Sequence, residues 1–157
     1  MYGDPQRVYA LAQHVEDKEQ AVRAQAHALR QQAAATHWES IAAQVHRDHV
    51  AHDARLLEHG ADRLREVVLD LRRHAAHMQH VIDEIHAAEE HVRRWFQHAE
   101  RSFTQALVHA GEAVVDFFRH PSAPWAHWPW HPDRLPTSGH LDWLDALHLT
   151  RTSAWQP

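Results

Sequence analysis

The sequence predicts an all-α protein built on a long antiparallel helical hairpin. Apolar residues recur every seven positions through most of the first hundred residues, which is typical of packed helices. Glycine occurs only four times in 157 residues, and six of the seven prolines lie after residue 120. A chain of this length suits one domain followed by a tail.

The first helix is expected over about residues 5 to 35. Asp4 can cap its first turn, and Pro5 suits the first helical position because the N–H that proline lacks is not needed there. One apolar position then repeats every seven residues, occupied by Val8, Val15, Val22 and Leu29. Alanines beside this stripe would let a neighbouring helix approach closely.

The second helix is expected over about residues 40 to 97, after a bend at residues 36–40. Thr36 and Glu39 in this bend have the spacing of a capping box. The repeating apolar position of the second helix holds Leu57, Leu64, Leu71, Met78, Ile85 and Val92. Because a short connection makes two helices antiparallel neighbours, residues 1–100 are predicted to form a hairpin. These six residues and the four of the first helix are its predicted packing interface.

The remainder of the chain divides into a third helical segment and a tail. Residues 101–120 have helical apolar spacing, which does not decide whether they continue the second helix or fold back on it. Residues 121–157 are rich in Pro and Trp, so a continuous helix cannot persist there. A short helix is expected at 141–149, with Ser138 as its cap. The tail is expected either to bind a partner or to cover the apolar surface of the helices.

Composition and motif content argue against several classes of function. The absence of cysteine excludes disulfides, thiolate metal sites and a cysteine nucleophile. The formal net charge of −5 and the lack of a basic stripe argue against nucleic acid. No apolar run reaches the length of a membrane-spanning helix, and the N-terminus has no signal-peptide core. No nucleophile motif or phosphate-binding glycine loop is present, so we expect a protein without enzymatic activity and without a cofactor.

Histidine is the main competing signal, with 19 residues. Two sets place nitrogen and oxygen ligands on one helical face: His46, His49 and Asp53, and His77, His80 and Glu84. They support an alternative function as a metal-binding or pH-responsive helical protein. The second set projects away from the apolar seam, and the inward positions are mostly hydrocarbon, so the leading interpretation has no metal site.

The bend contains Trp38-Glu39-Ser40 between two amphipathic helices, and this arrangement resembles the WXG100 superfamily of bacterial type VII (ESX) secretion systems. Members of that family carry Trp-x-Gly in the bend of a helical hairpin and dimerise into a four-helix bundle. Ser40 stands where the family has glycine. The run from Phe96 to Glu100 is similar to the Tyr-x-x-x-Asp/Glu export signal of the family, with Phe96 in place of tyrosine. The resemblance covers about residues 5 to 100.

The resemblance implies a secretion-associated protein that pairs with itself or with a related hairpin. Trp38, Glu39, Ser40, Phe96 and Glu100 would then form the surface that a partner or the secretion machinery recognises. Such a protein is expected in the bacterial cytoplasm before export and leaves without a cleavable signal peptide. A cytosolic coiled-coil adaptor without a link to secretion is the third interpretation.

Overall fold

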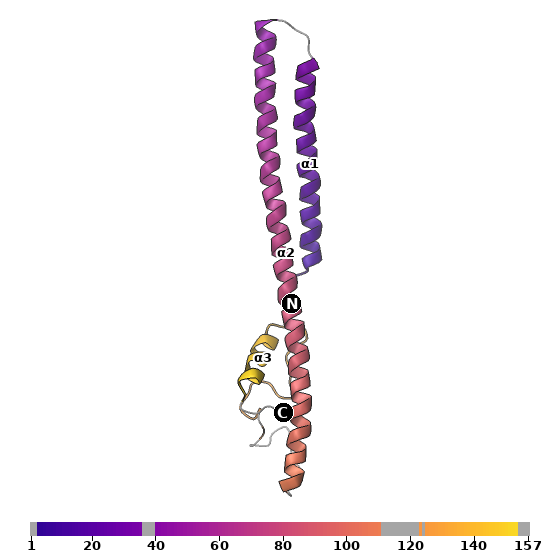
Figure 1. Cartoon of the computed structure of the whole chain (residues 1–157), viewed down its shortest axis with the longest axis vertical. Coiled ribbons are helices and arrows are strands. Elements are labelled where there is room, and N and C mark those ends of the chain that lie inside the picture. The colour runs from indigo at the N-terminus through magenta and orange to yellow at the C-terminus, as the bar shows by residue number, and fades with distance from the viewer. Residues whose placement is uncertain (1–2, 36–39, 111–122, 124, 154–157) are drawn as a thin grey trace. The chain divides into compact units, whose positions relative to one another are not determined.

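The computed structural model describes residues 3–35, 40–110, 123 and 125–153 (Figure 1). They form three helices: α1 (Pro5–Ala35), α2 (Ile41–Ala110) and α3 (Asp142–Thr152). Among these residues the only β pairing is an isolated bridge between His131 and Arg134. The prediction of an all-α protein is confirmed. The chain divides into two compact units, one from Asp4 to Met78 and the other chiefly from Gln79 onward.

Short polar side chains begin both long helices. α1 begins at Pro5, where Asp4 Oδ1 accepts a hydrogen bond from the backbone N–H of Gln6 at 2.9 Å. α2 begins at Ile41, where Ser40 Oγ accepts one from the backbone N–H of Ala43 at 3.1 Å. Ser40 is therefore the N-cap of α2. The predicted capping box of Thr36 and Glu39 lies outside the described residues.

The end of α2 differs from the sequence prediction. The second helix was expected over about residues 40 to 97, and residues 101–120 were expected either to continue it or to fold back on it. α2 continues without interruption to Ala110. No proline or glycine occurs between Gly60 and the end of α2. Phe103 and Leu107 also keep the apolar stripe in phase and stay buried. The remaining ten residues of the predicted third segment, 111–120, lie outside the described residues.

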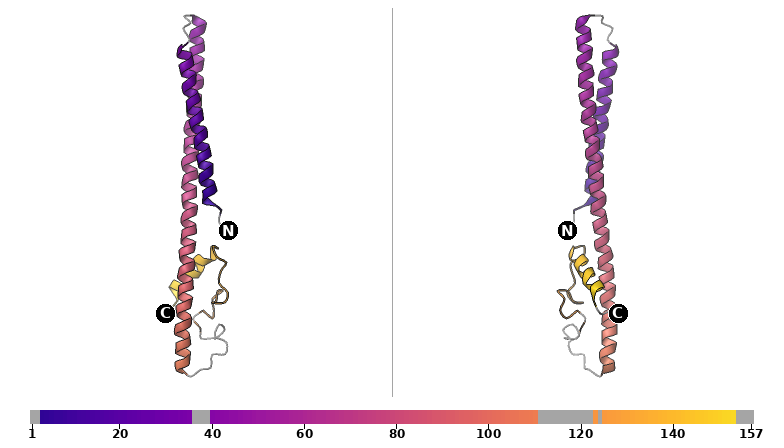
Figure 2. Two further views of the ribbon diagram at one scale, coloured as in Figure 1. Left: turned by 90° about the vertical axis from the view of Figure 1, so that its right-hand side faces the viewer. Right: turned by 60° about the vertical axis from the view of Figure 1, so that its left-hand side comes forward.

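In the unit Asp4–Met78, α1 and the first part of α2 lie side by side and antiparallel (Figures 1 and 2). The ion pairs Glu16–Arg72, Arg23–Asp62 and Arg30–Glu58 set their register. Residues at seven-residue intervals fill the buried centre, and five of the seven are alanines. We call this set the alanine ladder: Ala12, Glu19, Ala26, Ala54, Ala61, Val68 and Ala75. The small alanine side chains allow the two backbones to approach closely.

In the second unit, residues 123 and 125–153 cover one face of α2. Trp125 and Trp143 are fully buried and pack with Ile85, Val92 and Phe96 of α2 in one apolar core. Of the two roles expected for the Trp- and Pro-rich tail, the structure therefore shows the covering one. α3 begins one residue later and ends three residues later than the predicted helix at 141–149.

Candidate functional site

The alanine ladder has two different flanks. In an α-helix, the residue three positions after a given one lies about 60° to one side, and the residue four positions after it lies about 40° to the other. Four positions after six of the seven ladder residues, all but Ala75, stand charged side chains: Glu16, Arg23, Arg30, Glu58, Arg65 and Arg72. Three positions after the same six ladder residues stand only aliphatic side chains. The ladder therefore separates a charged flank from an aliphatic one.

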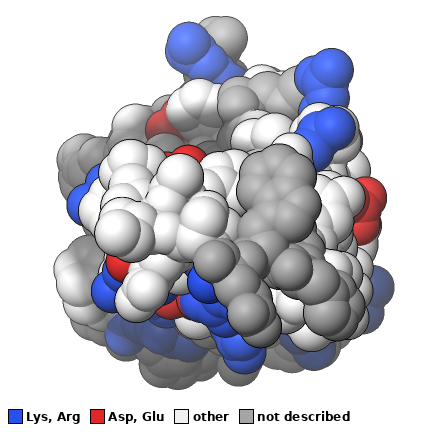
Figure 3. Space-filling view, turned by 90° about the horizontal axis from the view of Figure 1, so that it is seen from above, with Lys and Arg blue, Asp and Glu red and all other residues white. Residues whose placement is uncertain are grey.

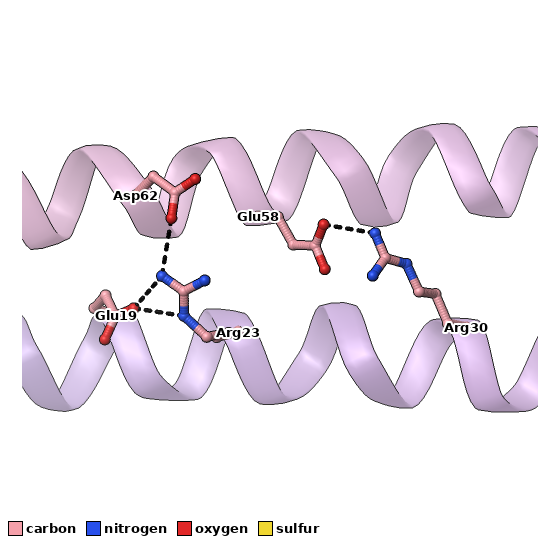
Figure 4. A network of polar contacts seen from close by, with 5 residues as sticks. All are labelled: Glu19, Arg23, Arg30, Glu58 and Asp62. Carbon is pink, nitrogen blue, oxygen red and sulfur yellow. Dashed lines mark hydrogen bonds and ion pairs between the residues drawn. The ribbon is translucent and has the colours of Figure 1, made fainter.

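The charged flank is closed by ion pairs between the helices (Figure 4). Arg23 Nη2 lies 3.0 Å from Asp62 Oδ1 of α2 and 2.6 Å from Glu19 Oε1 of its own helix. These two hydrogen-bonding carboxylates, Asp62 first and Glu19 second, raise the pKa of Arg23 above its ordinary value. Arg30 Nη2 of α1 forms an ion pair with Glu58 Oε2 of α2. Because the ion pairs join the charged flanks of both helices, the aliphatic flanks must lie together on the opposite side.

The opposite flank carries a regular set of partly exposed aliphatic residues. We call it the aliphatic band: Val8, Val15, Val22, Leu29, Leu57, Leu64 and Leu71. The register of the ion pairs places Val15 level with Leu71 and Leu29 level with Leu57. Leu11 and Val67, each one position before a ladder residue, extend the two margins of the band and are 50% and 46% exposed. The band is thus an apolar strip with a seven-residue repeat that the described part of this unit leaves partly uncovered.

The ten residues of the predicted packing interface divide into two sets. Seven of them form the aliphatic band, beside the line of closest helix contact. The other three, Met78, Ile85 and Val92, are buried. The centre itself is the alanine ladder, because helices in close contact exclude large side chains from the line of closest approach.

The predicted recognition motif in the bend is described only at Ser40, since Trp38 and Glu39 lie outside the described residues. Ser40 is exposed, and its hydroxyl caps α2. The neighbouring Ile41 is 87% exposed and Val45 is 49% exposed. Figure 3 views the molecule from above, and a group of described residues without charge, drawn white, faces the viewer there. The start of α2 therefore presents apolar side chains to solvent.

Phe96 does not have the exposure that a recognition residue needs. Its ring is 3% exposed and meets Trp125 edge-on at a centroid distance of 5.8 Å, within the core of the second unit. Glu100, one turn further, is partly exposed. The C-terminal segment covers the Phe96 ring in this conformation, so its use in partner recognition stays a prediction.

A polar cluster around Glu89 was not predicted from the sequence. Arg93 donates to Glu89 Oε1 through Nε at 3.1 Å and Nη2 at 2.8 Å. Glu89 Oε2 accepts from the hydroxyl of Ser138 at 3.0 Å and from the backbone N–H of Gly139 at 3.3 Å. Burial acting alone raises the pKa of Glu89, but hydrogen bonds from Arg93, Ser138 and Gly139 outweigh it, and the pKa is lowered overall. Ser138 therefore binds α2 instead of capping α3 as predicted.

The histidine candidates stay apart from one another. In the described part of the chain, no three His, Asp or Glu side chains gather closely enough to hold a metal ion. His46, His49 and Asp53 are exposed on α2, as are His77, His80 and Glu84. His80 Nε2 lies 3.4 Å from Glu84 Oε1, which makes a two-residue contact on the surface.

Comparisons with protein-family models, curated proteins and solved structures found no significant match to this chain. None of the described helices has a stretch long and apolar enough to cross a membrane.

Proposed function

We propose that this chain is a non-enzymatic protein that acts by pairing its hairpin with a second helical hairpin, either another copy or a related chain. The observation that carries the proposal is the aliphatic band. Seven partly exposed aliphatic side chains follow one flank of the hairpin, while ion pairs occupy the other flank. A contiguous apolar strip of this kind on a protein surface marks an interaction site.

The spacing of the band favours helices as the partner. Its residues repeat every seven positions on both helices, which is the repeat of side chains that interdigitate between packed helices. A second hairpin laid on the band would complete a four-helix bundle with the aliphatic residues at its centre. Leu11 and Val67 at the margins would become buried in the same contact.

We further propose that the paired hairpin belongs to a bacterial type VII secretion system. The support is the Trp38-Glu39-Ser40 sequence at the bend, its resemblance to the WXG100 pattern, and the exposure of Ile41 and Val45 beside it. Ser40 supplies a hydroxyl cap at the position where the WXG100 pattern has glycine. In this proposal the secretion machinery recognises the bend end of the bundle.

The pairing is tested by light scattering coupled to size exclusion. Leu64→Glu places a charge in the middle of the band, and Leu56→Glu is the matched control on a side chain that is 56% exposed. Position 56 lies two residues after Ala54, or about 200° around the helix, and so faces away from the ladder. We expect wild type and Leu56→Glu to be dimers and Leu64→Glu to be a folded monomer. A wild type that stays monomeric at high concentration excludes self-pairing.

The secretion step needs a separate experiment in a host with an active or an inactivated type VII ATPase. We expect wild type in the medium only when the ATPase is active, and reduced export for both Trp38→Ala and Leu64→Glu. A protein that stays in the cells under both conditions would instead be a cytosolic adaptor. If Leu64→Glu is exported as well as wild type, secretion does not require pairing.

A further inference from the structure

One face of α2 in the second unit is strongly apolar and lies under the C-terminal segment. Phe96 and Phe103 of this face are 3% and 5% exposed, and Ala99 between them is fully buried. Both phenylalanine rings meet Trp125 edge-on, at centroid distances of 5.8 and 5.9 Å. Within the described part of the chain, residues 123 and 125–153 cover this face. We call residues 123 and 125–153 the cover.

Hydrogen bonds from the cover to α2 meet at the carboxylate of Glu89. Both oxygens of Glu89 are occupied: Arg93 of α2 binds Oε1, while Ser138 and the backbone of Gly139 bind Oε2. Its side chain is 14% exposed, so these bonds are partly shielded from water. Hydrogen bonds to a charged acceptor in such a place are about twice as strong as neutral ones.

The backbone of the cover is shaped for this contact. Gly139 has a φ of +74°, a conformation that costs glycine little and that residues with a side chain rarely adopt. Its N–H points at Glu89 in this conformation. Arg93 continues the cluster, since its guanidinium lies over the indole ring of Trp143 at 5.0 Å, and Trp143 Nε1 donates to the carbonyl of Thr137 at 3.0 Å. Glu89 and Arg93 thus hold both the turn before α3 and the first turn of α3.

We propose that Glu89 is a latch, and that the cover is released from α2 as a unit when this carboxylate no longer binds it. The 11 residues of α3 are too few to form a stable helix alone, so the cover should lose its structure when it leaves. The unit Asp4–Met78 has its own buried ladder and its own ion pairs, and it stays folded. Release exposes the apolar face of α2.

The latch also has a consequence for recognition. Phe96 and Glu100 match the spacing of the export signal, and the cover hides the Phe96 ring. Release would make that ring accessible to a partner. This consequence rests on the proposed function, whereas release of the cover does not, because it involves neither the aliphatic band nor the bend.

The experiment uses thiol labelling of the full chain, which has no cysteine of its own. Ala99→Cys places one reporter beneath the cover, and Ala26→Cys places another in the alanine ladder; both alanines are 0% exposed. Each reporter is combined with Glu89→Gln, and with Glu90→Gln as the matched control, because Glu90 is exposed and adjacent. Ser138→Ala is a milder variant that removes one donor to the carboxylate.

We expect Glu89→Gln to speed labelling beneath the cover on the order of tenfold, as the loss of charge-assisted hydrogen bonds would. Ser138→Ala should have a smaller effect in the same direction. Glu90→Gln should have none, and the ladder reporter should keep its wild-type rate in every variant. Equal rates for Glu89→Gln, Ser138→Ala and wild type would overturn the latch. If the labelling rate of the ladder reporter rises together with that of the reporter beneath the cover, the cover is not released independently of the unit Asp4–Met78.

Discussion

Glu19 is the one charged residue of the alanine ladder, and Arg23 of the next helical turn holds its carboxylate at 2.6 Å. The Glu19 side chain is only 11% exposed, whereas Arg23 is 43% exposed and also reaches Asp62 on α2. Arg23 thus neutralises a charge at the centre of the pair and joins the two helices. The two residues should therefore respond differently to substitution.

Arg23→Ala is expected to destabilise the hairpin, because it leaves the Glu19 carboxylate in the ladder without its cation. Glu19→Ala is expected to be neutral or stabilising by up to about 1 kcal/mol, since alanine matches the ladder and has the best helix propensity. Urea unfolding followed by circular dichroism measures both. The double variant Glu19→Ala/Arg23→Ala should regain most of the stability that Arg23→Ala alone loses. If the double variant is as unstable as Arg23→Ala alone, the bond between Arg23 and Asp62 carries the effect.

Ser40 is expected to matter for the first turn of α2. Ser40→Ala removes the hydrogen bond to the N–H of Ala43 and should cost about 1 kcal/mol, whereas Ser40→Gly should cost only a few tenths. Ser40→Asp keeps an acceptor at this position and serves as the control. Hydrogen exchange of the amides at residues 42–45 reports the loss directly. Unchanged exchange in Ser40→Ala would mean that the cap does not stabilise this turn.

The sequence predicted the class of fold and the start of the first helix because these depend on local signals. Apolar periodicity, the Asp4-Pro5 pair and the proline-rich tail each act within a few residues. The sequence pattern did not identify the alanine ladder as the line of closest helix contact, because valine and leucine dominate a hydrophobic pattern even where alanine is buried. A stripe three positions wide does not reveal which of its positions faces the partner helix.

The cluster at Glu89 lay beyond sequence reasoning for a different reason. Its bond to Ser138 joins residues 49 positions apart, and no local pattern connects them. The burial of Phe96 has the same origin, since it depends on tryptophans of the tail more than 25 residues further along the chain. Contacts of this kind depend on how the tail folds back, which periodicity does not encode.

Glu89 should make docking of the cover depend on pH. Burial raises its pKa, but the hydrogen bonds from Arg93, Ser138 and Gly139 lower it by more, so the carboxylate is a stronger acid in the folded chain. Its contribution to stability is therefore complete above the ordinary glutamate pKa and is lost as the pH falls through the lower folded-state pKa. Tryptophan emission of wild type and Glu89→Gln across this range measures the effect. The difference between the two proteins should disappear in acid, and a constant difference would contradict the assignment.

Gly60 is a glycine in the interior of α2, and a Cβ added to it would meet nothing within 4 Å. An interior helical glycine costs about 1 kcal/mol relative to alanine, so Gly60→Ala should stabilise the isolated hairpin by about that amount. The matched control, Ala61→Gly, adds a second glycine, now within the buried ladder, and should destabilise the hairpin.

The same substitution tests the partner contact. Gly60 stands one position before Ala61, as Val67 does before Val68, and so lies on the same margin of the aliphatic band. If a partner helix packs closely there, the added methyl group should weaken dimerisation while it stabilises each hairpin. Denaturation and sedimentation equilibrium of Gly60→Ala measure the two effects separately. If Gly60→Ala stabilises the hairpin and leaves dimerisation unchanged, the partner must pack away from Gly60, toward the α1 side of the band. The added methyl group would then remain in open space and would not touch the partner.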